Sequence, residues 1–472
     1  MNIKKILIFV LLAAINSFMQ AAQLNYTGGK ESLQEPVNTA LERNSNLPDP
    51  ILTPGLASQP VNSFSFIQEP DFVYIDSLVA EALQNNPELK AARNITSAAK
   101  TKIDQVSTWE SPQVGVELFQ TPVQSFPNPF KDGMETDYFI QQMFPFPGKI
   151  SAMTSSMENN AAMVEQQYFA LEKRIIKQLK DYYYELYLIQ KKIEINKENQ
   201  DLMRQFTEIT RKQYEVGMGK QPDVIRSQTE LSTLINEGIN LEKEKTDIQT
   251  MINTILSRPA NAELGLVPDP ADSLPSWQFD DVYNLALGNR PELKGMGYNI
   301  DMYKSELDAT KLEYYPDIMG RVMYKDMANT SDDFWALMVG VNIPLAPWSG
   351  GKYTGKVEEN ELNVKTAEEQ YNLMKNMVAS DVQNSLVKIE TNRNLVDLYQ
   401  NTVIPQAEQT LQSTISAYQT GKTEFLMLID AYRMLLMSQL DFYMSKMNFL
   451  QSQAQLEQAV GLSIEQIKNE IK

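Results

Sequence analysis

The sequence predicts a mainly α-helical protein that carries a small set of membrane β-strands and consists of two copies of one unit. Three observations support this fold class: an internal repeat with an offset of 204 residues, helical segments with coiled-coil spacing, and a strand-like segment that alternates as membrane strands do. With 472 residues and a mean hydropathy of −0.35, the chain is too polar on average for a helical membrane protein.

The composition excludes several kinds of catalytic site. The chain contains no Cys and no His, so it has no Cys/His zinc site, no cysteine nucleophile and no Ser–His–Asp triad. The net charge of −18 disfavours nucleic-acid binding, because phosphates repel an acidic protein. We therefore expect no enzyme, no cofactor, no resident metal and no nucleic-acid partner.

The N-terminus has the features of a cleavable signal peptide. Lys4 and Lys5 precede an apolar stretch at residues 6–15 that is too short to span a bilayer. We place the signal peptide over residues 1–22. After it, no apolar run reaches 18 residues, so a segment of this chain that enters a membrane must do so as a β-strand.

Short sequence elements recur in the same order in the two halves of the chain. The segment LQNNPELK at residues 83–90 returns as LGNRPELK at residues 287–294, and the YEVG turn at 214–217 returns as YQTG at 418–421. The chain therefore divides into a signal peptide, an irregular extension rich in Pro, Asn, Gln and Ser, and two repeats, at residues 1–22, 23–72, 73–270 and 271–472.

Each repeat is expected to contain the same series of elements. In the first repeat these are helix 75–109, strands 112–120 and 136–144, and helices 149–213 and 222–256. In the second repeat they are helix 279–313, strands 316–325 and 334–343, and helices 352–416 and 423–459. Each long helix would measure roughly 97 Å. The helices 222–256 and 279–313, stacked end to end, would match that length at roughly 105 Å, which describes the wall of a tall tube.

The apolar spacing of the helices indicates packing between helices. In the first long helix, apolar residues recur at intervals of four and three, at Ile175, Leu179, Tyr182, Leu186, Ile189 and Ile193. The last helix carries two apolar stripes, one with Phe425, Leu428, Tyr432, Leu435 and Phe442, the other with Leu426, Ile429, Leu436, Leu440, Tyr443, Met447 and Leu450. Arg433 interrupts the second stripe. Two stripes predict a helix between two neighbours, as in a ring.

The segment 334–343 has the pattern of a membrane strand. Large apolar residues alternate with small or polar ones, at Trp335, Leu337, Val339, Val341 and Ile343. We predict that these five residues face lipid, although a buried sandwich strand would alternate in the same way. Four strands cannot close a barrel, since the smallest barrels have about eight, so a barrel would have to be shared between chains.

After the second strand of each repeat, a Pro is followed by a Gly–Lys pair, within residues 145–149 and 344–352. These two segments, the twofold repeat, the two PELK elements and the Tyr-x-x-Gly turns together resemble the TolC-like outer-membrane factor family over about residues 75–465. The resemblance implies a homotrimer, with a 12-stranded β-barrel on a 12-helix α-barrel. It also implies the exit duct of an efflux or type I secretion system in the outer membrane of a Gram-negative bacterium. The duct would extend into the periplasm, contact outer-membrane lipid, and receive substrates from a periplasmic adaptor protein and an inner-membrane pump.

The resemblance also assigns residues to a closed periplasmic mouth. In the family, a Tyr before one Gly turn bonds an Asp after the other, and these positions correspond to Tyr418 and Asp223. A family Arg that helps to hold the mouth shut corresponds to Thr423, and two family Asp residues around the pore correspond to Met427 and Asp430. The residues alone leave open that Asp223 only caps its helix and that Asp430 is an ordinary solvated side chain.

Gly217 and Gly421 follow the two long helices. Gly is the usual residue just after the end of a helix, so both are expected to be helix caps. The resemblance implies that they also form the tips that the adaptor contacts.

Two alternatives stay open. One is an exported coiled-coil structural or adaptor protein without a membrane barrel, although such a scaffold would not need the outward apolar face of residues 334–343. The other is export of Cu(I) or Ag(I), because the 23 Met residues are soft ligands, although Met also fills cores. Because the chain lacks Cys, we expect no lipid anchor at an N-terminal Cys.

Overall fold

The computed structural model describes residues 72–125, 133–270, 276–327, 332–344 and 348–471. All of them belong to one compact unit, Gln68–Lys472. The predicted signal peptide lies outside the described residues, and so does the predicted extension except for Phe72. Both therefore stay predictions, as do the boundaries of the two repeats.

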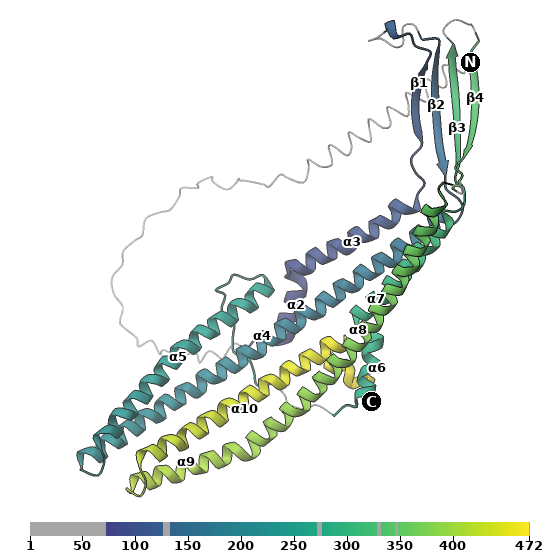
Figure 1. Cartoon of the computed structure of the whole chain (residues 1–472). Coiled ribbons are helices and arrows are strands. Elements are labelled where there is room, and N and C mark those ends of the chain that lie inside the picture. Colours follow the sequence, from purple (N-terminus) through teal and green to yellow (C-terminus); the bar gives the residue numbers. More distant parts are fainter. Residues whose placement is uncertain (1–71, 126–132, 271–275, 328–331, 345–347, 472) are drawn as a thin grey trace, which may run out of the picture. The chain divides into compact units, whose positions relative to one another are not determined.

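The predicted mainly helical chain with four strands is confirmed (Figure 1). The first half contains α2 (Ile75–Asn85), α3 (Pro87–Ser107), β1 (Gln113–Phe119), the 3-10 turn η1 (Val123–Ser125), β2 (Glu135–Phe144), α4 (Lys149–Glu215) and α5 (Gln221–Leu256). The second half contains α6 (Phe279–Asn289), α7 (Pro291–Leu312), β3 (Ile318–Met327), β4 (Phe334–Val341), α8 (Gly350–Leu398), the π-helical segment η2 (Tyr399–Val403), α9 (Ile404–Gln419), α10 (Phe425–Val460) and α11 (Ile464–Glu470). The bounds of α2 and α5 recur at an offset of 204 residues in α6 and α10.

The strands form one antiparallel sheet in the order β1-β2-β3-β4. The order follows the chain, so β1 and β4 are the two edges. At the helical end of the sheet, Lys149 at the start of α4 forms an ion pair with Asp317 before β3, with 2.8 Å between Nζ and Oδ1. This pair joins the two repeats where their strands meet their helices.

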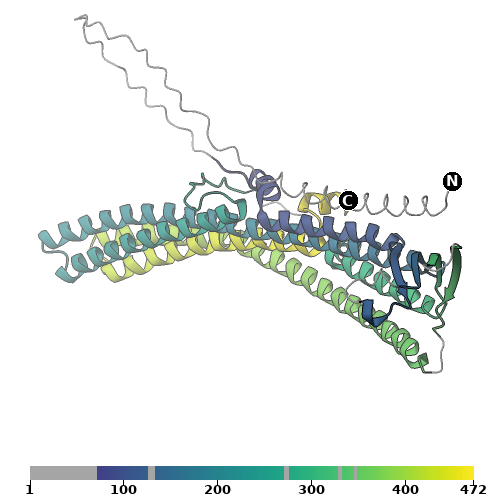
Figure 2. The same cartoon turned by 90° about the horizontal axis from the view of Figure 1, so that it is seen from above.

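Helix α4 is the central element of the unit. Near the strands, the helices lie in the row α3-α4-α7-α8, and toward the two helical turns they lie in the row α5-α4-α10-α9. Figure 2 shows the hairpin of α4 and α5 beside the hairpin of α9 and α10. Among the described residues, every helix is too short or too polar to span a lipid bilayer.

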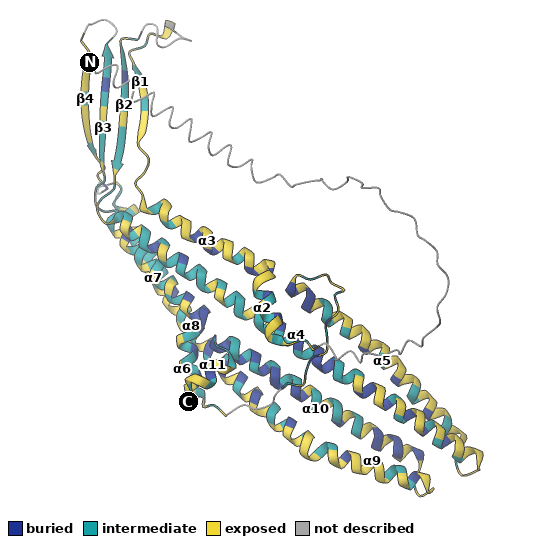
Figure 3. Ribbon diagram, turned by 180° about the vertical axis from the view of Figure 1, so that it is seen from behind, coloured by how far each residue is buried: buried dark blue, intermediate teal, exposed yellow. Residues whose placement is uncertain are grey.

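The core follows α4 and α10, whereas α5 and β4 are largely exposed (Figure 3). Of the predicted stripe on α4, four residues are buried and Tyr182 and Ile193 are half-buried; the buried ones are Ile175, Leu179, Leu186 and Ile189. On α10, the first predicted stripe contributes Phe425, Leu428 and Tyr432 to a buried cluster near the turns. The prediction that α10 lies between two neighbours is confirmed, since α4 and α9 flank it.

The predicted helices 75–109 and 279–313 are each divided into two, so the prediction of continuous helices was wrong. The breaks lie at Asn86 and Arg290, where ψ is 123° and 120°. In each case the next residue is a Pro, which disfavours the helical conformation in the residue before it but suits the first position of a helix. The repeated PELK element therefore starts a new helix.

The predicted helix 352–416 is interrupted as well. It is observed as α8 and α9, separated by η2. Pro405 lies in the first turn of α9; it has no N–H to donate, and its ring would clash with the carbonyl group of Asn401 in a regular helix. The wider π turn accommodates the ring.

The stacking of the short helices also differs from the prediction. Helix α5 does not continue into α7; its end meets the junction of α2 and α3, where Asn86 Nδ2 donates to the carbonyl oxygen of Ile255 at 2.9 Å. Arg258 Nε donates to Glu81 Oε1 at 2.6 Å at the same junction. Helix α10 likewise ends at Gly461, against the junction of α6 and α7. Each short helix is therefore anchored to the helix break of its own repeat.

Asn86 serves both sides of this junction. Its Oδ1 accepts from the backbone N–H groups of Glu88 and Leu89 at 2.9 and 3.2 Å, while its Nδ2 donates to Ile255. Asn86→Ala should lower the free energy of unfolding by roughly 2–3 kcal/mol, since it removes a helix cap and leaves a buried carbonyl group unpaired. Urea denaturation of the detergent-solubilised protein would measure the loss. Asn94→Ala, at an exposed position of α3, is the control and should change the free energy by less than about 0.5 kcal/mol.

Candidate functional site

One face of the sheet is apolar and exposed. The register places Val114, Ile140, Val322 and Leu337 in one row across all four strands. Each of these side chains is at least 48% exposed. The next row contains Val116, Tyr138, Tyr324 and Trp335. An exposed apolar surface that crosses a whole sheet is the kind of surface that lipid or another protein covers.

The opposite face carries charged side chains. Glu117, Asp137 and Lys325 lie in one row of the register. Lys325 Nζ is 3.1 Å from Asp137 Oδ2 and 2.5 Å from Glu135 Oε1. Ion pairs of this density suit a surface in contact with water rather than hydrocarbon.

The five residues predicted to face lipid lie on the apolar side of β4 or just beyond its end. The exposed fractions of Trp335, Leu337, Val339 and Val341 are 77%, 62%, 66% and 55%, and Ile343, after the end of β4, is 73% exposed. Met338, between them in the sequence, pairs with Arg321 on the charged face. The structure thus places the apolar residues of β4 on one face of the sheet and Met338 on the other. Contact with lipid stays a prediction.

The two helical turns at the other end of α4 and α9 have the same cap. Gly217 and Gly421 adopt φ of 76° and 70°. The N–H of Met218 donates to the carbonyl of Gln213 at 2.8 Å, and the N–H of Lys422 donates to that of Ala417 at 2.9 Å. This is the Schellman arrangement, which favours Gly because other residues rarely adopt positive φ. Their role as caps is confirmed, while contact with an adaptor stays a prediction.

The two turns touch each other. Gln213 Nε2 donates to the carbonyl oxygens of Tyr418 and Gln419 at 3.3 and 3.2 Å. Lys220 and Glu424, which follow the two turns, form an exposed ion pair at 3.5 Å. The hairpin of α4 and α5 is therefore tied to the hairpin of α9 and α10 within one chain.

Tyr418 is buried next to Asp223 without bonding to it. Tyr418 is 5% exposed, and its ring centroid lies 5.6 Å from that of Phe425. Its hydroxyl group has no hydrogen-bond partner among the described residues. Burial and the negative charge of Asp223 raise the pKa of Tyr418 to about 12. The predicted bond between Tyr418 and Asp223 is therefore absent within the chain, although the two groups are close enough to interact electrostatically.

The other three residues predicted at the mouth lie at the start of α10 or just before it. Thr423 is half-buried, Asp430 is exposed, and Met427 is 57% exposed. Met427 does not belong to the hydrophobic cluster that holds Tyr418. Their place around a pore stays a prediction.

An ion pair that the sequence did not predict connects α5 in one hairpin to α10 in the other. Arg433 on α10 donates through Nη2 to Glu230 Oε2 at 2.7 Å and through Nε to Glu230 Oε1 at 3.2 Å. The Glu230 side chain is only 17% exposed, and the bonds to it raise the pKa of Arg433. The position of Arg433 within an apolar stripe indicated a polar contact of this side chain. The partner could not be identified from the sequence, because Glu230 is 203 residues away.

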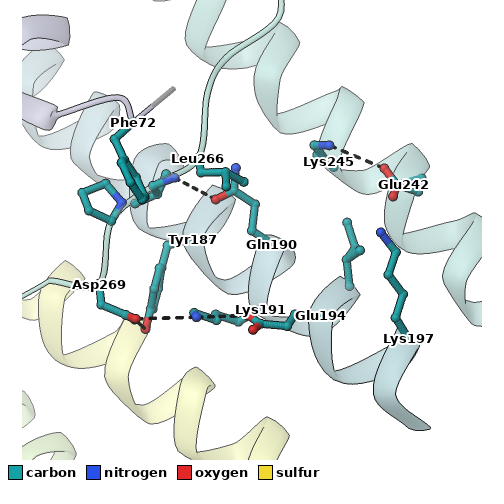
Figure 4. A pocket seen from close by; sticks show the side chains of 13 residues that line it. Phe72, Tyr187, Gln190, Lys191, Glu194, Lys197, Glu242, Lys245, Leu266 and Asp269 are labelled. Carbon is teal, nitrogen blue, oxygen red and sulfur yellow. Dashed lines mark hydrogen bonds and ion pairs between the residues drawn. The ribbon is translucent and has the colours of Figure 1, made fainter. Parts of the chain in front are cut away.

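A groove of about 580 Å³ lies between α4, α5 and the segment that follows α5 (Figure 4). Several of its charged side chains bind one another: Lys191 Nζ is 3.0 Å from Glu194 Oε2 and 3.6 Å from Asp269 Oδ2. Tyr187 donates to Asp269 Oδ1 at 2.6 Å. The described residues include no cluster of acidic side chains arranged to hold a metal ion. We therefore assign no catalytic or cofactor site to the groove.

The chain is similar to outer-membrane proteins in sequence and fold. A family model described as outer membrane efflux protein matches residues 78–257 and 282–462. Outer membrane protein TolC of Vibrio cholerae is 19% identical over 398 residues, which cover 82% of this chain and 90% of that protein. The outer-membrane channel OprN has a TM-score of 0.71 at 16% identity, with 83% of this chain and 90% of that chain covered. For VceC of Vibrio cholerae the TM-score is 0.70 at 17% identity, with 83% and 96% covered. The predicted TolC-like fold is thereby confirmed.

The positive φ of Gly421 leads to a testable prediction. Gly421→Ala should cost about 1–2 kcal/mol locally, because a Cβ disfavours this conformation. We expect hydrogen exchange of the Lys422 amide, which closes the cap, to accelerate by roughly 5–30-fold. Gly351→Ala, where an added Cβ meets nothing within 4 Å, is the control and should leave that exchange rate unchanged. An unchanged rate in Gly421→Ala would show that the cap does not depend on Gly.

Proposed function

The chain belongs to the outer membrane efflux protein family, and we propose that three copies of it form the outer-membrane exit duct of a tripartite efflux or type I secretion system. The observation that carries this proposal is the sheet, with one apolar face, one charged face and two edges that stay unpaired among the described residues. The duct conducts substrates passively and has no catalytic activity of its own. Family membership favours this function over an exported coiled-coil scaffold.

The sheet needs partners outside the chain. Within the described residues, β1 and β4 each pair with a strand on one side only. In hydrocarbon, each unpaired backbone group costs several kcal/mol, so a membrane sheet has to close on itself. Pairing β4 of one copy with β1 of the next would close three sheets of four strands into 12 strands. The apolar face would then contact lipid, and the charged face would line the water-filled interior.

The helices support the same threefold arrangement. Both rows of helices are four wide, so three copies give 12 helices at each level. In the row near the turns, α5 and α9 are the outer members. Their free sides are available to the neighbouring copies, as in the closed wall of a tube.

The partners and the location follow from this arrangement as parts of the proposal. The barrel would lie in the outer membrane of a Gram-negative bacterium, with the helices in the periplasm. A periplasmic adaptor would dock on the turns at Gly217 and Gly421 and connect the duct to an inner-membrane pump. The proposal includes export through the signal peptide at residues 1–22, without a lipid anchor. The outer-membrane channel OprN and the outer membrane protein VceC, which share the fold, support this location.

We assign closure of the periplasmic mouth to the contacts between the two hairpins. Opening requires the hairpins to separate, and separation would break the bidentate pair of Arg433 and Glu230. This pair would replace the Arg that is absent at Thr423. Tyr418 and Asp223 would contribute once the assembly or a bridging water provides the bond that the single chain lacks.

The orientation of the β4 side chains leads to a test of the proposed duct. Val339→Arg would place a charge on the apolar face and should destabilise the assembly by roughly 2–4 kcal/mol per chain near the bilayer midplane. Met338→Arg, one residue away on the charged face, is the matched control and should be tolerated. The yield of heat-modifiable trimer extracted from the outer membrane, together with its conductance in planar bilayers, would measure both effects. Equal loss in the two variants would mean that the faces are misassigned.

The pair of Arg433 and Glu230 gives a second test. Glu230→Gln keeps the shape of the side chain but removes its charge, so closure should weaken by about 1 kcal/mol per chain, a small value because Arg433 is half exposed. We expect a higher resting conductance in planar bilayers. Glu237→Gln removes the same charge from an exposed position on α5 and should behave as wild type. A resting conductance in Glu230→Gln equal to that of wild type would remove this pair from the closure mechanism.

A further inference from the structure

On the charged face of the sheet, a long side chain lies over a glycine at each edge. Gly115 on the edge strand β1 pairs with Phe139 on β2, and Gly340 on the edge strand β4 pairs with Met319 on β3. A Cβ added at Gly115 would lie 2.5 Å from Cζ of Phe139, and one added at Gly340 would lie 2.9 Å from Cε of Met319. The ring and the thioether methyl group therefore occupy the space that a side chain at each glycine would fill.

The ring of Phe139 is held over the edge strand by contacts within the chain. Cζ of Arg321 lies 4.4 Å from the centre of this ring, and Nε of Arg321 donates to Gln141 Oε1 at 2.8 Å. Nη1 of Arg321 is 3.9 Å from Oε2 of Glu117 on β1, so the side chain extends from β3 across β2 toward the same edge. An aromatic ring placed over an edge glycine stabilises strand pairing and register.

The exposed large apolar side chains of the charged face also lie at its edges. In the described part of the sheet they are Phe119 on β1, which is 51% exposed, and Phe334 and Met338 on β4, which are 54% and 44% exposed. The large apolar side chains that β2 and β3 place on this face are half-buried: Phe139, Met143, Met319, Met323 and Met327. Exposed apolar side chains along the rim of a face with several ion pairs indicate that a partner covers this rim.

The proposed assembly places a second copy of the chain against each edge. In that assembly β4 of one copy lies beside β1 of the next, and neighbouring strands of a sheet are about 4.8 Å apart. A side chain in a sheet contacts the side chains that lie opposite it on both adjacent strands. Gly115 and Gly340 have no side chain to make these contacts. The contacts at the two positions therefore fall to Phe139 and Met319, which each come from one strand further inside the sheet.

The two edges have matching chemistry on the charged face. There β4 carries Phe334, Ala336 and Met338, none of which is charged. Aromatic rings and thioethers attract each other, so the ring of Phe139 suits this row. Phe119 ends β1 and Phe334 begins β4, so both lie at the end of the sheet away from the helices. A neighbouring copy would bring these two rings to the same end of the seam.

We propose that Phe139 and Met319 bind the neighbouring copy of this chain on the water-facing side of the seam between β4 and β1. This inference rests on the proposed function, because the seam exists only in the closed barrel. It goes beyond the pairing of backbone groups, since it assigns the contact between copies to side chains of the inner strands. The packing of each sheet and its assembly with the next are thereby linked through Gly115 and Gly340.

Photo-crosslinking of the full-length protein in outer membranes tests the contact without assuming a register between copies. The photoreactive residue p-benzoylphenylalanine replaces Phe139, or Tyr138 in the matched control. Tyr138 lies on the opposite face and pairs with Val116, whose side chain separates it from the edge. We expect light to link position 139 to β4 of another copy, seen as a dimer on a denaturing gel and identified by mass spectrometry of the linked peptides. Position 138 should give no link between chains.

The rate at which the trimer dissociates in detergent measures the strength of the contact. Phe139→Ala should raise this rate roughly tenfold, because it removes the ring from all three seams. Adding Gly115→Val to Phe139→Ala should restore most of the loss. A β-branched side chain then stands at position 115 itself, and the ring that it would strike is gone.

The outcomes separate this inference from the proposed function. Links from position 139 that stay within one chain, in a protein that is a trimer by mass measurement, would overturn the inference and leave the duct in place. A dissociation rate of Phe139→Ala equal to that of wild type would overturn it as well. So would a double variant that dissociates as fast as Phe139→Ala, because the ring would then serve only its own sheet. A wild type that is a monomer would contradict both the duct and the contact.

Discussion

Backbone groups that enter the hydrocarbon of a membrane need hydrogen-bond partners, and this constraint governs the whole molecule. The four strands leave both edges of their sheet unpaired within the described part of the chain, while the register gives the sheet one apolar and one charged face. A sheet of this kind is stable in lipid only as part of a closed barrel. The need to close the barrel makes the chain depend on other copies of itself. The helices lie in rows of four, so a closed wall of helices also needs several copies of the chain.

Because the chain contains two copies of one unit, each copy contributes both to the sheet and to the helical turns at the other end. Each repeat supplies a pair of helices divided at a Pro, two strands, one long helical stretch and the helix that follows its Gly turn. The two Gly caps have matching hydrogen bonds. The repeats are not equivalent in detail, however. Pro405 widens the second long helix into a π turn, whereas α4 is continuous. The ion pair of Arg433 and Glu230 then joins one repeat to the other, so movement of one hairpin relative to the other has an energetic cost near the turns.

Patterns with a short period predicted most of the fold. The alternation from Trp335 to Ile343 and the heptad spacing of Ile175 and its neighbours depend only on local geometry, so they could be read from the sequence. The breaks at Asn86 and Arg290 were also encoded locally, by the prolines that follow them, but two helices separated by one residue have nearly the same apolar pattern as one helix.

Features that depend on tertiary register could not be predicted in this way. The partner of Arg433 lies in the other repeat, and no spacing rule connects positions 203 residues apart. The end of α5 packs against the junction at Asn86, which is a matter of how helices are placed in space rather than of their lengths.

The number of chains in the membrane-extracted protein tests the central claim most directly. Native mass spectrometry of the protein purified from outer membranes in mild detergent would give this number without reference to activity. The account predicts a single species of three chains, because three sheets are needed to pair every edge. A monodisperse monomer with its β-strands formed, as judged by circular dichroism of the same sample, would contradict it.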